Sequence, residues 1–328
     1  MKSKRILTGD RPTGPLHLGH YFGTLENRLR LQDKGYECFI IIADYQVLTD
    51  RLETGTIGKN ILELTKDYLS IGLEPSKCTF FVQSKIPELA ELTLIFSMLV
   101  SVARVSRNPT VKDEIRSMKI EDTFSLGMFS YPVSQAADIL LFNPSLVPVG
   151  EDQLPHVELT REIARKFNAL YGKVFRIPEP LLGRSPRLKG LDGQEKMSKS
   201  RNNAIFLSDK PNIVRAKILK AKTDMGREIR YDPINKPEIS NLLNLFHLLT
   251  KKPIDQLENE YKGKGYEEFK QSLAEAIVSF LHPIQERKLC LSDDDAINVL
   301  KDGTNKASKE AAQMMKRVVK AMKTDYGF

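Results

Sequence analysis

The polar stretch at residues 196–200 concentrates cations and hydroxyl groups in a segment with little capacity to pack as a helix or a strand. Its members are Lys196, Met197, Ser198, Lys199 and Ser200. Small and polar residues on both sides are typical of a surface loop. A loop with two ammonium groups can close over a polyphosphate and neutralise charge that develops as a phosphate bond breaks. Taken alone, the stretch is better interpreted as a solvated charge run, which is what most Lys/Ser tracts are.

A second candidate is the motif HLGH at residues 17–20, between a predicted strand and a predicted helix. His17 and His20 are spaced so that both imidazoles can turn toward phosphate, together with the unpaired N–H groups of a helix start. Gly19 lacks a Cβ, so the flat face of a purine can approach its backbone. A lone H-x-G-H also fits an ordinary helix start. Combined with the predicted loop at 196–200, here called the lysine loop, this motif predicts the two halves of one nucleotide site.

The elements that must position these motifs alternate between strand and helix in the first half of the chain. Short apolar runs predict strands at Arg5–Thr8, Cys38–Ala43, Thr79–Val82 and Leu146–Val149. Helices are predicted at Ile57–Leu69, from Pro87 to about Arg104, from Tyr131 to Leu141, and after Gln153, with an irregular charged segment at 106–124. This alternation predicts an α/β fold with a Rossmann-like, doubly wound parallel sheet.

The second half of the chain shows only helical spacing after about Leu207. Asp209 is the predicted N-cap of a helix that begins near Pro211 and runs to Lys222. Further helices are predicted at Ile239–Leu249, Ile254–Tyr261, Phe269–Leu289, Asp293–Leu300 and Lys306–Met322. We therefore expect a catalytic domain at 1–207 and an all-helical domain at 208–328, with the last helix able to pack back on the first domain.

Three polar loops follow predicted strands, at Gly9–Gly14, Asp44–Thr49 and Gly150–Gln153. Open α/β sheets bind ligands at the carboxyl ends of their strands. These loops are therefore the expected walls of the site.

Composition indicates which kind of partner and which cellular compartment to expect for the protein. The net charge is +8, and Lys217, Lys220 and Lys222 lie in a basic stretch, which permits a polyanionic partner such as RNA. The three cysteines, Cys38, Cys78 and Cys290, stand beside apolar residues and predict buried free thiols in a reducing compartment. Neither a signal-peptide pattern nor a run long enough to span a bilayer is evident, so we expect a cytoplasmic protein.

Asp138 is the most informative residue for choice of substrate. It interrupts the apolar helical run Ala136–Leu141, where a carboxylate is costly unless it is paired. One interpretation is an acceptor for a substrate donor group, and the other is a helix-face acid paired with an arginine.

HLGH followed much later by KMSKS resembles the signature pair of class I aminoacyl-tRNA synthetases. The resemblance extends over most of the chain, and further blocks are similar to those of bacterial tryptophanyl-tRNA synthetases. These blocks are TGDRPTG at 8–14, AADILL at 136–141, VPVGEDQ at 147–153 and ISNLL at 239–243.

The resemblance implies a two-step reaction. The amino-acid carboxylate attacks the α-phosphate of ATP and expels pyrophosphate, and a terminal ribose hydroxyl of tRNA then takes the acyl group. Catalytic roles are implied for His17, His20, Lys196 and Lys199. Contacts with ATP are implied for Arg11, Pro12, Thr13, Gly19, His20, Gly150, Glu151, Asp152, Leu188, Lys196, Met197, Ser198, Lys199 and Ser200. Mg²⁺ is expected to arrive with ATP and to have no protein ligands. The implied partners are L-tryptophan, tRNA(Trp) and a second copy of the chain in a homodimer.

For the amino acid, the resemblance implies that Asp138 accepts the indole N–H, which can only donate. The other implied contacts are Leu7, Gly9, Tyr131, Gln135 and Gln153. Tyr131, Gln135 and Asp138 also have the Y-x-x-x-Q-x-x-D spacing of tyrosyl-tRNA synthetases, and Gln135 stands where many tryptophanyl enzymes have methionine. Leu7 replaces an aromatic residue common in them. The longer block ending in Gln153 favours tryptophan. The alternatives are tyrosine, a paralogue that does not aminoacylate, and a nucleotidyltransferase of the H-x-G-H type.

Overall fold

The computed structural model describes residues 4–118, 123–183, 188–193, 196–199 and 201–326. The chain forms two compact units, and each unit is built from ranges that are not contiguous in the sequence. The sheet unit comprises Met1–Gly14, Arg28–Gly183 and Ser292–Phe328, and the helical unit comprises Pro15–Asn27 and Arg184–Leu291. These bounds differ from the predicted boundary at 207/208. That boundary separates a catalytic domain from a helical domain by their expected roles, and those roles stay a prediction.

The sheet unit is built on five parallel strands in the order β3-β2-β1-β4-β5. They are β1 (Arg5–Asp10), β2 (Glu37–Ile42), β3 (Cys78–Val82), β4 (Leu146–Val149) and β5 (Glu179–Leu182). This order confirms the predicted doubly wound α/β class. The sequence prediction missed β5, a half-exposed edge strand that contains Pro180 and therefore lacks the apolar run of a central strand.

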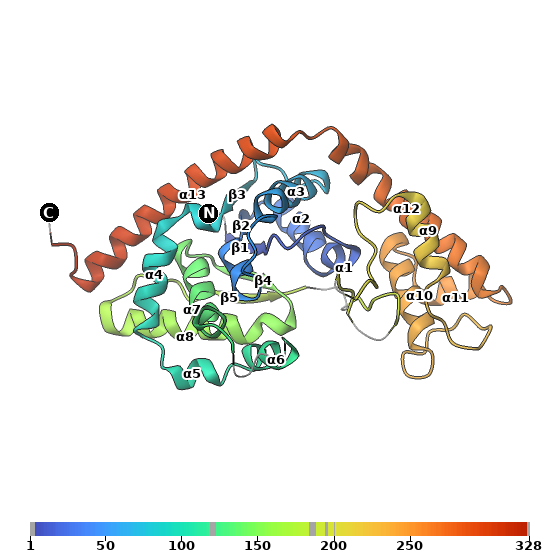
Figure 1. Cartoon of the computed structure of the whole chain (residues 1–328), viewed down its shortest axis with the longest axis horizontal. Coiled ribbons are helices and arrows are strands. Elements are labelled where there is room, and N and C mark those ends of the chain that lie inside the picture. The colour runs from blue at the N-terminus through green and yellow to red at the C-terminus, as the bar shows by residue number, and fades with distance from the viewer. Residues whose placement is uncertain (1–3, 119–122, 184–187, 194–195, 200, 327–328) are drawn as a thin grey trace. The chain divides into compact units, whose positions relative to one another are not determined.

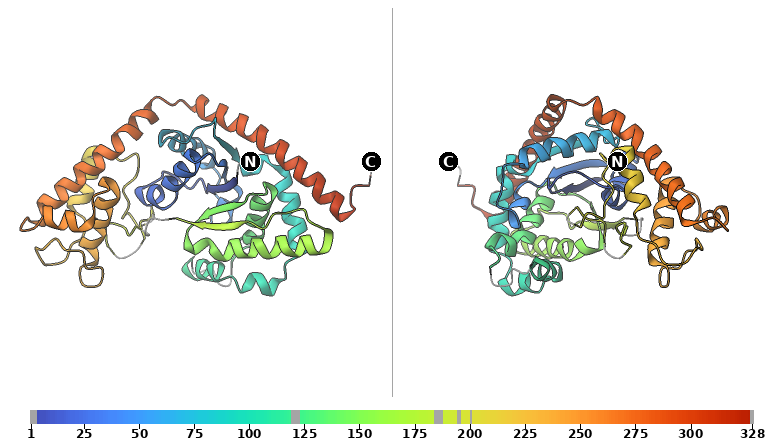
Figure 2. Two further views of the ribbon diagram at one scale, coloured as in Figure 1. Left: turned by 180° about the vertical axis from the view of Figure 1, so that it is seen from behind. Right: turned by 45° about the vertical axis from the view of Figure 1, so that its right-hand side comes forward.

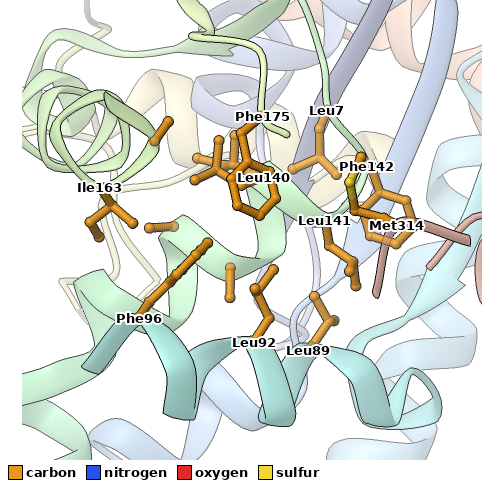
Figure 3. Packing of buried hydrophobic residues seen from close by; sticks show 14 of the residues in the cluster. Leu7, Leu89, Leu92, Phe96, Leu140, Leu141, Phe142, Ile163, Phe175 and Met314 are labelled. Atoms are coloured by element: carbon orange, nitrogen blue, oxygen red, sulfur yellow. The ribbon is translucent and has the colours of Figure 1, made fainter. Parts of the chain in front are cut away.

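Helices of the sheet unit and its short turns have the following bounds. They are η2 (Tyr45–Thr49), α3 (Ile57–Ser70), η3 (Gln83–Lys85), α4 (Pro87–Ser97), α5 (Val102–Ser106), α6 (Pro109–Met118), α7 (Leu126–Leu141), η4 (Glu151–Gln153), α8 (Leu154–Tyr171) and α13 (Asp293–Met322), while α2 (Glu26–Asp33) begins in the other unit. The main core lies where α4, α7, α8 and α13 meet the sheet, and Figure 3 shows Phe96, Leu140, Ile163 and Met314 converging there. Burying each such side chain contributes about 2 kcal/mol.

Helix α13 is a single helix, although the sequence predicts a break between Leu300 and Lys306. Gly303 and its polar neighbours interrupt the apolar pattern locally. In the structure α13 packs on β3, α3 and α4 (Figures 1 and 2). A Cβ on Gly303 would collide with the backbone carbonyl of Phe80 in β3. The glycine therefore serves close contact between the helix and the strand, not a turn.

Two other boundaries in the sheet unit were predicted wrongly because capping residues were overlooked. The helix expected to reach Arg104 ends at Ser97, and α5 starts afresh where the Ser101 hydroxyl accepts the Arg104 N–H. Helix α7 begins after Ser125, whose hydroxyl accepts the Met128 N–H, and it continues through Pro132. A serine N-cap satisfies donors that a helix start leaves unpaired. The segment 106–124, predicted to be irregular, contains α6.

The helical unit confirms that the C-terminal region is rich in helices. It contains α1 (Leu18–His20), the π-helical turn η1 (Tyr21–Leu25), α9 (Pro211–Leu219), α10 (Pro237–Thr250), α11 (Ile254–Glu260) and α12 (Tyr266–Leu289). Helix α9 packs along α12, as Figure 2 shows. Asp209 is not the N-cap of α9, which is Lys210; the Asp209 carboxylate instead accepts the Phe206 N–H and the Lys217 ammonium.

All three cysteines are free thiols. Cys38 and Cys78 are buried, as predicted, but Cys290 is exposed because it follows the solvent-facing end of α12.

Among the described helices, none has both the length and the apolar content needed to cross a bilayer.

Candidate nucleotide and amino-acid site

The HLGH motif is fixed by the segment that follows the lysine loop. Leu18 N–H donates to Ile205 at 2.9 Å, and Leu207 N–H donates to Leu16 at 2.9 Å. Between these bonds His17 and Phe206 form an antiparallel bridge. Segments far apart in the sequence therefore form one local structure in the helical unit.

The two histidines of this motif lie against one another, with ring centroids 3.7 Å apart. The His17 backbone N–H donates to Nδ1 of His20 at 3.2 Å, which leaves the proton of that ring on Nε2. Burial, His20 and the charges of Lys199 and Lys196 lower the pKa of His17 to about 3. His17 is therefore a neutral imidazole at neutral pH, and it can act on phosphate by hydrogen bonding and not by charge.

Gly19 is the contact point between the two motifs. A Cβ there would lie 2.9 Å from His17 Nδ1 and 3.2 Å from the Cβ of Met197. Met197 is 5% exposed, so it anchors the lysine loop against HLGH. The structure thus brings His17, Gly19 and the lysine loop together, as the paired motifs predict.

In the described part of the lysine loop the two lysines differ in exposure. Lys196 is exposed, whereas Lys199 and Ser198 are half-buried. The base of the loop is closed by a bridge between Lys189 and Lys196, and the Met197 N–H donates to buried Leu188 at 3.3 Å. Ser200, a predicted ATP contact, lies outside the described residues.

The remaining predicted ATP contacts belong to the sheet unit, at the carboxyl ends of the neighbouring strands β1 and β4. After β1 come Arg11, Pro12 and Thr13; after β4 come Gly150, Glu151 and Asp152. Arg11 forms an ion pair with Asp50. A Cβ on Gly150 would lie 2.8 Å from an Asp152 carboxylate oxygen. The predicted ATP contacts therefore form two groups, one in each unit.

Three of the six predicted amino-acid contacts lie on one face of α7. Tyr131, Gln135 and Asp138 are spaced at i, i+4 and i+7, which places them on the same side of a helix. The Gln135 amide donates to the Gln153 side chain at 3.4 Å, which joins α7 to the turn after β4.

Leu7 and Gly9 take different places. Leu7 is 3% exposed in the core cluster shown in Figure 3, and the Gly9 carbonyl accepts from Arg28 at 3.1 Å. Their contact with a bound amino acid stays a prediction.

Asp138 is buried, and the hydrogen bonds that hold its carboxylate come from side-chain amides. Gln83 Nε2 donates to both of its carboxylate oxygens, at 2.8 and 2.9 Å. Burial raises the pKa of Asp138 to about 7; the Gln83 hydrogen bond opposes this and the Asp44 charge adds to it. Among the described residues Gln83 Oε1 is buried with no hydrogen-bond partner. An amide, not the arginine considered from the sequence, holds this carboxylate.

Gln83 was missed by the sequence prediction, although a signal for it exists. It is the first polar residue after β3, and so it obeys the same strand-end rule that identified the other three loops.

Tyr131 belongs to a hydrogen-bond network that the sequence also did not reveal. Its hydroxyl lies 2.7 Å from the Glu114 carboxylate and 3.0 Å from Nε2 of His156, and Asn108 Nδ2 lies 3.1 Å from Nδ1 of that histidine. A carboxylate only accepts, so the hydroxyl donates to Glu114 and accepts the Nε2 proton of His156. Burial lowers the pKa of His156 to about 4, which keeps the ring neutral. Burial and the Glu114 carboxylate raise the pKa of Tyr131 well above its usual value.

Within the described residues, no group of three or more His, Cys, Asp or Glu side chains could hold a metal ion.

Comparison with known proteins identifies the class. The family model of class I tRNA synthetases (W and Y) matches residues 1–282. The chain belongs to this family, as the two motifs predict.

Within the family, several relatives found by sequence are tryptophan–tRNA ligases. That of Chlamydia caviae is 43% identical over 97% of this chain and 95% of its own length, and that of Clostridium longisporum is 41% identical over 99% and 98%. The tryptophanyl-tRNA synthetase of Mycoplasma pneumoniae has a TM-score of 0.88 at 29% identity over 98% of this chain and 97% of its own. The enzyme of Campylobacter jejuni, solved with ADP and tryptophan, has a TM-score of 0.84 at 32% identity over 97% and 99%. The resemblance to bacterial tryptophanyl-tRNA synthetases is confirmed.

Proposed function

We propose that this protein is a tryptophan–tRNA ligase, which activates L-tryptophan with ATP and transfers it to tRNA(Trp). The observation that carries the proposal is the buried Asp138 carboxylate, held by Gln83 on the same helix face as Tyr131 and Gln135. An indole N–H is a donor only, so a buried acceptor is its complement. A competitor without that donor would bury the carboxylate without forming this additional hydrogen bond, at a cost in binding.

The first step needs alignment and charge stabilisation and no covalent enzyme intermediate. His17 and His20 would donate hydrogen bonds to phosphate or ribose oxygens, because both rings carry a proton on one nitrogen. Lys196 and Lys199, whose charges already act on His17, would stabilise the pyrophosphate as it leaves. The family resemblance also implies contacts with ATP for Arg11, Pro12, Thr13, Gly150, Glu151 and Asp152. Mg²⁺ bound to the phosphates would share their negative charge.

The second step requires tRNA, and we propose that tRNA binds to the basic surface of the helical unit. Lys220 and Lys222 are exposed at the end of α9. Lys217 is unsuitable, because its ammonium donates to Asp209 at 2.6 Å and to the Ala204 carbonyl at 2.9 Å. We also propose a cytoplasmic location, since tRNA is charged there.

A second copy of the chain is the partner that we propose for an exposed apolar surface of the sheet unit. Leu94, Met98, Val102 and Leu126 are each more than half exposed, on or beside α4, α5 and α7, and α7 contacts both other helices. Exposed apolar patches of this kind mark interaction sites. Sedimentation should give a dimer for the wild type and a monomer for Met98→Glu, while Met225→Glu, at an exposed position of the helical unit, stays dimeric. A wild-type monomer would refute this assignment.

ATP–pyrophosphate exchange, measured separately with tryptophan and tyrosine, tests the proposed activity. We expect exchange with tryptophan. Exchange with tyrosine alone would reassign the amino acid, and exchange with neither would favour a paralogue that does not aminoacylate.

A further inference from the structure

Helix α10 holds the base of the lysine loop through one side chain. Asn241 Oδ1 accepts the Lys189 N–H at 3.2 Å. Its Nδ2 donates to the Lys189 carbonyl at 3.3 Å and to the Gly190 carbonyl at 3.0 Å. Asn241 is 6% exposed within a helix, a position where asparagine is neither a good helix former nor easily buried without partners. Its three hydrogen bonds to Lys189 and Gly190 account for the presence of an asparagine at this buried helical position.

A second asparagine continues the connection toward the lysines. Asn203 is 5% exposed, and its Oδ1 accepts the Ser198 N–H at 2.8 Å. Its Nδ2 donates to the Asp192 carboxylate at 2.9 Å and to the Lys196 carbonyl at 3.3 Å.

Gly190 is where the two asparagines meet. Its carbonyl is bound by Asn241, and a Cβ on it would collide with the Asn203 side-chain amide. A continuous series of contacts therefore runs from α10 through Gly190 and Asn203 to the backbone of Lys196 and Ser198.

We propose that Asn241 is a positioning residue, which makes the placement of the two lysine ammonium groups depend on helix α10. The inference rests on the proposed function and adds a coupling between the helical bundle and the loop. Charge stabilisation of a leaving group depends steeply on distance, and a displacement of about 1 Å can lower a rate about 100-fold. A shift of α10, such as binding of a large ligand to the bundle could impose, would move the loop through these hydrogen bonds.

A purely structural role makes a different prediction. Loss of stability alone would lower the amount of active enzyme and leave the rate constant of the folded fraction unchanged. A positioning role lowers the rate constant for adenylate formation while the dissociation constant for tryptophan, whose predicted contacts lie in the sheet unit, stays the same.

Single-turnover rapid quench with ATP and tryptophan, alongside thermal unfolding, tests the inference. We expect Asn241→Ala to lower the rate constant of adenylate formation about 10- to 100-fold. Asn244→Ala, on the same helix and making no hydrogen bond to the described part of the loop, is the matched control and should keep the wild-type rate. If the alanine variant does not fold, Asn241→Ser keeps a polar side chain but is too short for these bonds.

A double-mutant cycle with Lys199→Ala identifies the route of the effect. If Asn241 acts through the lysine loop, its removal should add little to the loss caused by Lys199→Ala. Fully multiplicative losses, or a folded Asn241 variant with the wild-type rate constant, would overturn the inference. A wild-type enzyme that forms no tryptophanyl adenylate would refute the proposed function instead, so the two failures are distinguishable.

Discussion

Replacing Asp138 by asparagine should raise the stability of the protein and lower its activity with tryptophan. The substitution removes a negative charge from a buried site with almost no change in shape. Burial raises the pKa of this carboxyl from 3.8 to about 7. At about 1.4 kcal/mol per pH unit, keeping it ionised in the folded protein costs about 4 kcal/mol. A neutral amide avoids that cost, and Gln83 can satisfy it by rotating its own amide so that the unpaired Oε1 accepts from the new NH₂ group.

The sign of the pH dependence follows from the raised pKa. Between about pH 4 and pH 7 the folded protein holds the Asp138 proton and the unfolded chain does not, so the wild type loses stability as pH rises. We expect the stability advantage of Asp138→Asn to be small near pH 4, to grow through this range and to level off above pH 7 at up to about 4 kcal/mol. Asp302→Asn, at an exposed position on α13, is the matched control.

Urea unfolding of wild type and variants from pH 4 to 8 measures the stability, and ATP–pyrophosphate exchange measures the activity. A charged acceptor strengthens a hydrogen bond by about 1–2 kcal/mol over a neutral one, so kcat/KM for tryptophan should fall about 5- to 30-fold in Asp138→Asn. A variant that is less stable than the wild type by the same amount at every pH would refute the assignment of a costly buried charge. Unchanged activity would refute its role in recognition.

Three further outcomes follow from the structure. Lys199→Ala should lower kcat for pyrophosphate exchange at least 10-fold with little change in KM for ATP, because the ammonium would act mainly in the transition state. Lys301→Ala, at an exposed position, is the control. Equal effects of Lys199→Ala on kcat and on KM would contradict a role in the transition state. Gly303→Ala should lower the melting temperature despite the better helix propensity of alanine, because the new Cβ meets the Phe80 backbone at a cost of about 1–3 kcal/mol; a raised melting temperature would disprove the close packing. Tyr131→Phe should destabilise the protein by about 1–3 kcal/mol and raise KM for tryptophan, since buried His156 and half-buried Glu114 lose their shared partner. Unchanged stability in calorimetry together with unchanged exchange kinetics would contradict this network.

The sequence predicted the features that rest on local pattern. Apolar runs located four of the strands, because a buried parallel strand requires almost unbroken hydrophobicity. The motifs at 17–20 and 196–200 were expected to form one site, and the structure joins them through Gly19 and Met197.

What the sequence did not reveal depends on contacts between distant segments. Pro132 and Gly303 are helix breakers by local propensity, yet each lies inside a helix because tertiary packing outweighs that propensity. The role of Asn241 could not be predicted from the sequence, since that role exists only once the loop is folded against α10. Gln83 differs, because its place at a strand end could have been recognised.

Helix α13 lies against β3, which is the edge strand of the sheet. An uncovered edge strand is a template for pairing with other chains. β3 reads CTFFV and is buried throughout, and the residues of α13 that cover it are synthesised long after it. At about 10 residues per second, this edge stays open for roughly twenty seconds after it is synthesised. Every nascent chain therefore passes through an aggregation-prone interval, and a chain truncated before α13 never leaves it.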